Sequence, residues 1–205
     1  MDGNSDDNPT MSHTLFKNEV APKVGHGKPT FMLLIDNLRW DQWEIIKPAV
    51  LDMFKLESED IFLSILPTAT QYSRNAIFAG LTPLDIERRF KDKWLNDEDE
   101  GGKNMYEEDF LVDQMQRLNL GKSYSYNKIT KHQAGKKLVE AIPNMMNNDL
   151  NVIVYNFVDM LSHARTEMEM IRELADDESA YRSITLSWFE HSPLKDMMER
   201  IAEYD

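Results

Sequence analysis

Three short apolar runs along the chain predict buried β-strands. The runs TFMLLID, residues 30 to 36, and NVIVYNFVD, residues 151 to 159, each lead into an acid, as in a strand that is covered on both faces. The run IFLSIL, residues 61 to 66, predicts another strand, which Pro67 would end. If these strands lie parallel, their carboxyl ends meet at one edge of a sheet, where ligand sites of such folds form.

Elsewhere the apolar positions recur at three- and four-residue steps, which is typical of helices. One helix is predicted from Trp40 to Phe54, where Pro48 would kink or divide it. A second is predicted over residues 71 to 79, with Gly80 as its C-cap. Further helices are predicted over residues 131 to 146 and 167 to 204.

Two segments lack this patterning. Residues 1 to 28 are polar without apolar periodicity and predict a linker, so the ordered domain is expected over residues 29 to 205. Residues 84 to 121 are charged and mixed, with an acidic, Gly-rich run at 96 to 102, and predict a surface insertion. Strands alternating with helices predict an α/β fold of three layers, with a mainly parallel sheet covered by helices.

Composition restricts the chemistry that the chain can perform. Its 205 residues are 41% hydrophobic, which suits one buried core, and none is cysteine. A metal would therefore be held by carboxylates, imidazoles and hydroxyls. The net charge of −13 argues against a general DNA-binding surface.

The apolar runs are too short to cross a membrane. The longest, Phe31 to Ile35, falls far below the roughly 20 residues that a spanning helix needs. The opening MDGNSDDNPT has neither the basic start nor the apolar stretch of a secretory signal. We therefore expect a cytoplasmic protein without a membrane partner.

Two of the runs deliver candidate metal ligands. Asp36 ends an apolar run, so its carboxylate could meet a metal at a strand tip; alternatively, it caps a helix that begins near Leu38. Asp159 and His163 form D-x-x-x-H, a spacing that lets both side chains face one ion from a helical turn. His163 could instead be a solvated or hydrogen-bonded histidine. No ligand role is expected for His13, His26, His132 and His191.

The segment LPTATQYSR offers residues for phosphate chemistry. Thr70 lies between a predicted strand and a helix, where backbone N–H groups favour a phosphoryl group and a metal could activate the hydroxyl. Thr70 could also be an N-cap, and Thr68 competes for either role. Arg74 would lie one turn along the helix and could bind a phosphate oxygen, or pair with a surface acid.

The segments FMLLIDNLRWDQW, LPTATQYSRNAIFAGL and VYNFVDMLSH resemble, in this order, the opening motifs of PglZ domains of the alkaline phosphatase superfamily. The resemblance covers residues 30 to 205 and is especially close to the effector domain of the PorX response regulators of type IX secretion. It implies two zinc ions, with Asp36 and Thr70 at one and Asp159 and His163 at the other. It further implies Thr70 as nucleophile, Thr68 as a supporting residue, and cyclic or short linear oligonucleotides as substrates of a phosphodiesterase.

The chain departs from this family in what it lacks. It contains no Asp-His dipeptide, which completes the first ion's ligands in the superfamily. The receiver domain that precedes the effector domain in PorX proteins is also expected to be missing. The expectation is therefore a fragment, incomplete at the C-terminus and inactive by itself. The alternative function is a signalling module that binds a sigma factor or a secretion-system component. The resemblance also implies a homodimer in the full-length parent.

Overall fold

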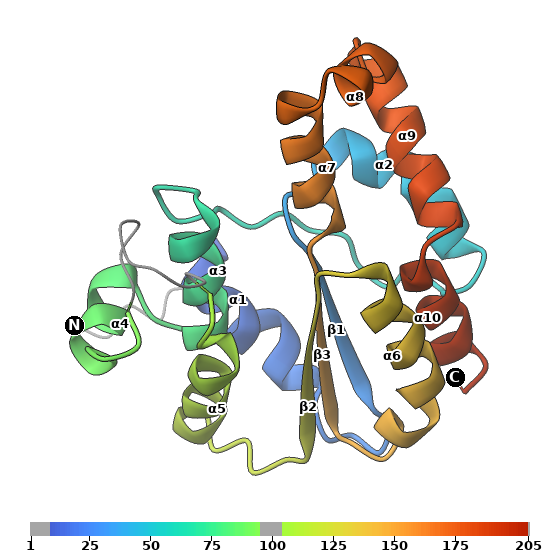
Figure 1. Ribbon diagram of the computed structural model, residues 1–205. Helices are drawn as coiled ribbons and strands as arrows, with labels where there is room; N and C mark the ends of the chain where they lie inside the picture. Colours follow the sequence, from blue (N-terminus) through green and yellow to red (C-terminus); the bar gives the residue numbers. More distant parts are fainter. Residues whose placement is uncertain (1–8, 95–103, 205) are drawn as a thin grey trace. The chain divides into compact units, whose positions relative to one another are not determined.

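The computed structural model describes residues 9–94 and 104–204. These residues form two compact units (Figure 1). The sheet unit comprises residues 27–58 and 123–204, and the helical unit comprises residues 9–26, 59–94 and 104–122. Within the described ranges, no helix is both long enough and apolar enough to cross a membrane.

A parallel sheet of three strands lies at the centre of the sheet unit. β1 (Thr30–Ile35) and β2 (Tyr124–Ile129) both pair with β3 (Leu150–Tyr155), which gives the order β1-β3-β2. The register aligns Ile35, Tyr155 and Ile129, the last residues of the three strands. The carboxyl ends of the strands therefore meet at one edge, as expected for a parallel sheet.

Six helices complete the sheet unit. In Figure 1, α6 and α10 lie side by side along the sheet, where they contact each other. Their apolar faces form a core with residues of the strands, including the fully buried Ile142 of α6, Ile153 of β3 and Met197 of α10. The helices are α2 (Trp40–Leu51), α6 (His132–Met145), α7 (Phe157–Glu167), α8 (Glu169–Leu174), α9 (Glu178–Glu190) and α10 (Pro193–Ala202).

The sheet unit confirms the expected α/β class with a parallel sheet. β1 and β3 lie in two of the predicted strands. β2 was not predicted, because its sequence YSYNKI is polar and five of its six residues are only partly buried at the edge of the sheet. Pro48 lies inside α2 without dividing it, since the helix continues to Leu51.

The helical unit buries three phenylalanines, Phe16, Phe78 and Phe110, which are at most 1% exposed. Its longest helices, α3 and α5, contact each other, and α3 also contacts α1 and α4. The elements are α1 (Ser12–Leu15), η1 (Phe16–Val20), η2 (Ala21–Lys23), α3 (Thr70–Ala79), α4 (Pro83–Arg89) and α5 (Glu107–Arg117).

Three sequence-based expectations differ from this unit. Residues 12–23, expected within a linker, are helical because Phe16 supplies a buried anchor. The expected surface insertion at 84 to 121 contains α5, whose Phe110 and Leu111 are buried; its run at 96 to 102 lies outside the described residues. The predicted strand at 61 to 66 is wrong: only Leu63 forms a β-bridge.

The incorrect strand prediction has a physical reason. The backbone of residue 63 bonds Thr10 and Ser12 on either side of the bridge to Met11, but the neighbouring residues have no ladder of partners among the described residues. Ile61 is 76% exposed and Leu66 is 81% exposed, so these side chains gain little from burial. An apolar run therefore forms a strand only where a neighbouring strand can pair with it.

Gly80 ends α3 in a left-handed conformation, as the predicted C-cap requires, with φ of 59°. A Cβ atom at this position would lie 2.1 Å from Oε1 of Gln114, whose amide donates to the backbone oxygens of Ile77 and Phe78. Gly80→Ala is therefore expected to lower the free energy of unfolding by more than about 1 kcal/mol in urea denaturation.

Gly121→Ala is the matched control in the same unit. A Cβ atom there would meet nothing within 4 Å, and the backbone does not have a positive φ. We expect a change within about 0.5 kcal/mol for this variant. Equal effects of the two substitutions would contradict the assignment of strain to Gly80.

Candidate functional site

The carboxyl edge of the sheet holds the first predicted ligand. Asp36 directly follows β1, and its backbone N–H donates to the carbonyl oxygen of Tyr155 at 3.0 Å, which extends the pairing with β3 by one residue. The alternative role as a helix cap is not observed, because α2 begins at Trp40 with Arg39 as its N-cap. The partly exposed Asp36 is thus positioned by the sheet at the edge where ligands bind.

α7 begins just after β3 and carries the other two predicted ligands. Asp159 lies in its first turn and His163 one turn later, with Nε2 of His163 3.7 Å from Oδ1 of Asp159. Nδ1 of His163 also lies 3.8 Å from Oε1 of Glu167. The predicted i, i+4 pair therefore exists on one helical face, with a carboxylate and an imidazole close together.

This pair fits part of a metal site. A carboxylate and an imidazole are suitable ligands for zinc, and His163 is exposed enough to turn toward an ion. However, no three His, Cys, Asp or Glu side chains gather closely enough to hold an ion within residues 9–94 and 104–204. The described residues therefore supply two adjacent donors and not a complete coordination sphere.

A polar cavity of about 440 Å³ opens between the loop after β1 and α7. Two arginines line it, Arg39 from the loop and Arg165 from α7, and their guanidinium carbons lie 5.4 and 4.7 Å from the ring centroid of Tyr181. The remaining lining residues are Asn37, Ser162, Thr166, Ala175 and Asp176. Arginines that stack on an aromatic ring are held in place for contact with an anion.

Acidic side chains on α2 and α9 form ion pairs with these arginines. Arg39 donates to Asp41 at 2.5 Å and to Glu178, and Arg165 donates to Glu178 at 3.1 Å. The hydrogen bond from Arg39 lowers the pKa of Asp41 to about 2, and Arg39 also lowers the pKa of Glu178. Both acids therefore stay ionised at neutral pH and hold the arginines at the cavity.

Thr70, the predicted nucleophile, belongs to the helical unit. It is the first residue of α3 and is half-buried, and Ala69 is the N-cap, so the alternative of Thr70 as N-cap is not observed. Its hydroxyl lies at the positive end of a helix of ten residues, as the interpretation of this segment required. Thr68 is exposed, and its carbonyl oxygen accepts a hydrogen bond from Ser73 at 3.3 Å.

Arg74 is buried in the same unit and pairs with an acid. Its side chain is 3% exposed and its Nε donates to Glu107 of α5, whose side chain is 1% exposed. A second guanidinium nitrogen lies 3.4 Å from the other carboxylate oxygen. The structure thus shows the alternative use of Arg74, in an ion pair, although the partner is a buried acid and not a surface one.

The remaining histidines have separate surroundings. His26 contacts the carbonyl oxygen of Pro22 at 2.9 Å, and His191 contacts that of Ser187 at 2.7 Å. Nδ1 of His13 is buried and makes no hydrogen bond to the described residues. His132 lines a second cavity of the sheet unit.

A comparison with known protein families agrees with this fold. Residues 15–202 match the family described as the BREX system PglZ alkaline phosphatase-like domain. The chain therefore belongs to the PglZ alkaline phosphatase-like family, and domains of this kind are generally metal-dependent. The match begins at residue 15, inside the segment expected to be a linker. No curated protein matches the chain.

Sequence reasoning missed the two arginines of the polar cavity. Arg39 lies three residues after Asp36, so its position beside a strand tip was a visible signal. Arg165 lies two residues after His163 and has no comparable signal, because its role depends on Tyr181 and Glu178 of a distant helix. Both arginines share the sheet unit with Asp36 and the Asp159–His163 pair.

Proposed function

We propose that this domain is a zinc-dependent phosphodiesterase. The observation that carries the proposal is the Asp159–His163 pair on α7, which begins at the carboxyl edge of the sheet where Asp36 also lies. Family membership supports phosphoesterase chemistry. Bound divalent cations would supply a Lewis acid for the phosphoryl oxygens and would activate the nucleophile.

The residues of the chain have distinct roles in this proposal. The resemblance implies that Asp159 and His163 would hold one ion, and that Asp36 and Thr70 would each be a ligand of the other. Thr70 supplies the hydroxyl that attacks phosphorus, and Thr68 supports it. Arg39 and Arg165 bind phosphate oxygens, for which they exchange part of their contact with Glu178.

The resemblance to PorX effector domains suggests the biological setting. The substrate is then a cyclic or short linear oligonucleotide, and the domain acts in the cytoplasm within a response regulator that controls type IX secretion. A sigma factor or a secretion-system component is the protein partner in that setting. These finer statements rest on sequence motifs around Asp36, Thr70 and Asp159.

Metal analysis and an ester assay test the proposal. The 205-residue chain, and any longer protein in which it occurs, is dialysed against zinc and assayed with bis(p-nitrophenyl) phosphate. We expect hydrolysis by the longer protein, which EDTA abolishes and added zinc restores. We also expect lower zinc content in His163→Ala than in the control His191→Ala. Zinc binding without hydrolysis of any phosphoester would contradict the enzyme and favour the signalling module.

A further inference from the structure

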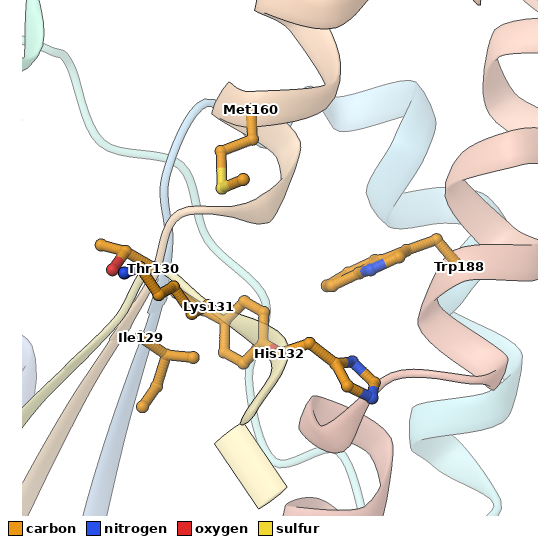
Figure 2. Close-up of a pocket in the computed structure, with 7 residues that line it drawn as sticks. Ile129, Thr130, Lys131, His132, Met160 and Trp188 are labelled. Atoms are coloured by element: carbon orange, nitrogen blue, oxygen red, sulfur yellow. The ribbon is translucent and has the colours of Figure 1, made fainter. Parts of the chain in front are cut away.

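A mainly apolar cavity of about 390 Å³ lies at the carboxyl ends of β2 and β3 (Figure 2). Ile129 and Tyr155, the last residues of these strands, line it together with Met160 of α7 and Trp188 of α9. Figure 2 shows Met160 and Trp188 pointing into the same space from different helices. Volumes of roughly 300–1,000 Å³ are usual for small-molecule sites.

The lining offers surfaces that suit a flat aromatic ring. The rings of Tyr155 and Trp188 lie 5.5 Å apart at 57°, so Tyr155 supports Trp188 from one side. Met160 is 51% exposed and adds a polarisable thioether that adapts to a ring. Aromatic side chains of this kind stack with nucleobases for about 1–3 kcal/mol per base.

Tyr155 also brings a phenol hydroxyl to this region. The residue is 5% exposed. Burial and the nearby Asp196 raise the pKa of Tyr155 to about 12, so the phenol remains protonated as a donor. A protonated phenol can donate a hydrogen bond to a polar atom of a ligand.

The mouth of the cavity is polar and has no acid among its seven lining residues. Thr130, Lys131 and His132 are exposed there, and Lys131 is the N-cap of α6, a helix of 14 residues. In Figure 2 the ring of His132 lies below that of Trp188. In a chain with a net charge of −13, this lysine and helix start form a local positive region for a phosphate.

We propose that this cavity binds the base of a nucleotide, which stacks on Trp188 and Met160 while its phosphate lies toward Lys131. This inference rests on the proposed phosphodiesterase function, because Met160 directly follows the ligand Asp159 in α7. A nucleoside in the cavity is then the neighbour of the phosphate that is cleaved.

Binding without turnover tests the cavity. The 205-residue chain is titrated in EDTA with AMP and with ribose 5-phosphate, and ligand-observed NMR measures the dissociation constants. We expect AMP to bind at least about fivefold more tightly, since stacking of the base is worth about 1–3 kcal/mol. Trp188→Leu should remove most of this difference, and Trp40→Leu, which changes a tryptophan of α2 outside the cavity, should leave it intact.

A second pair of variants avoids damage to the core. Met160 is exposed, so Met160→Ala should remain folded and weaken AMP binding several-fold, whereas Met170→Ala, at an exposed methionine of α8, should not. Circular dichroism confirms that each variant folds. Equal affinity for AMP and ribose 5-phosphate, or AMP affinity unchanged in Met160→Ala, would overturn the inference.

The two proposals fail in different ways. Hydrolysis of bis(p-nitrophenyl) phosphate needs no base, so it reports on the catalytic residues alone. Hydrolysis without base-dependent AMP binding refutes the cavity and leaves the phosphodiesterase standing. The opposite result is AMP binding that depends on Met160 and Trp188 in a protein that hydrolyses no phosphoester. This result refutes the phosphodiesterase proposal and supports the nucleotide site.

Discussion

Thr70→Ala is expected to lower the rate of phosphodiester hydrolysis by at least about a thousandfold, because it removes the hydroxyl that we propose as the nucleophile. The measurement is the initial rate with bis(p-nitrophenyl) phosphate, in the form of the protein that hydrolyses this ester. Stability should change little, since Thr70 follows the N-cap of α3 and its side chain does not cap the helix. Zinc content, measured by mass spectrometry, should remain largely unchanged.

Thr68→Ala is the matched control for the nucleophile. Thr68 lies two residues earlier and is exposed, so its loss should lower the rate far less than the loss of Thr70. Full activity in Thr70→Ala would remove this residue from the mechanism. A larger loss in Thr68→Ala would assign the nucleophile to Thr68, the other threonine of the segment LPTATQ.

The ion pair between Arg74 and Glu107 provides the largest expected effect on stability. Both side chains are almost completely buried, so removal of one leaves a charge without its partner in a region of low polarity. Glu107→Leu and Arg74→Met should each lower the free energy of unfolding by about 3–5 kcal/mol. Urea denaturation of the whole chain measures this loss.

The double variant separates charge from packing. Replacing both residues, with Arg74→Met and Glu107→Leu together, removes the unpaired charge and should recover much of the lost stability. The exposed pair Lys93–Asp109, at 2.9 Å, serves as control, and Asp109→Asn should cost no more than about 1 kcal/mol. Additive losses in the double variant would show that the two charges act independently.

The elements that the sequence predicts well are those with strong local signals. β1 and β3 are continuous apolar runs, and Gly80 after α3 is a local cap, so each needs only a few neighbouring residues. The Asp159–His163 pair is likewise local, because one helical turn brings the two side chains together. These features depend little on what the rest of the chain does.

The features that the sequence missed depend on residues far apart in the chain. The apolar segment at 61 to 66 is not a strand, because a strand needs a ladder of hydrogen bonds to a neighbouring strand and this segment forms only one bridge. The polar β2 becomes a strand because β3 pairs with it. The mainly apolar cavity at the ends of β2 and β3 joins His132, for which the sequence predicts no ligand role, to Trp188 of α9. No local pattern could have brought these residues together.

The order of the strands has a consequence for synthesis of the protein. β1 and β2 pair only with β3 in the described part of the chain, and β3 is the last of the three to leave the ribosome. Until β3 has been synthesised, β1 has no strand to pair with. Its apolar side chains therefore remain accessible to chaperones or to other nascent chains. This sheet therefore cannot assemble until its central strand, β3, has been translated.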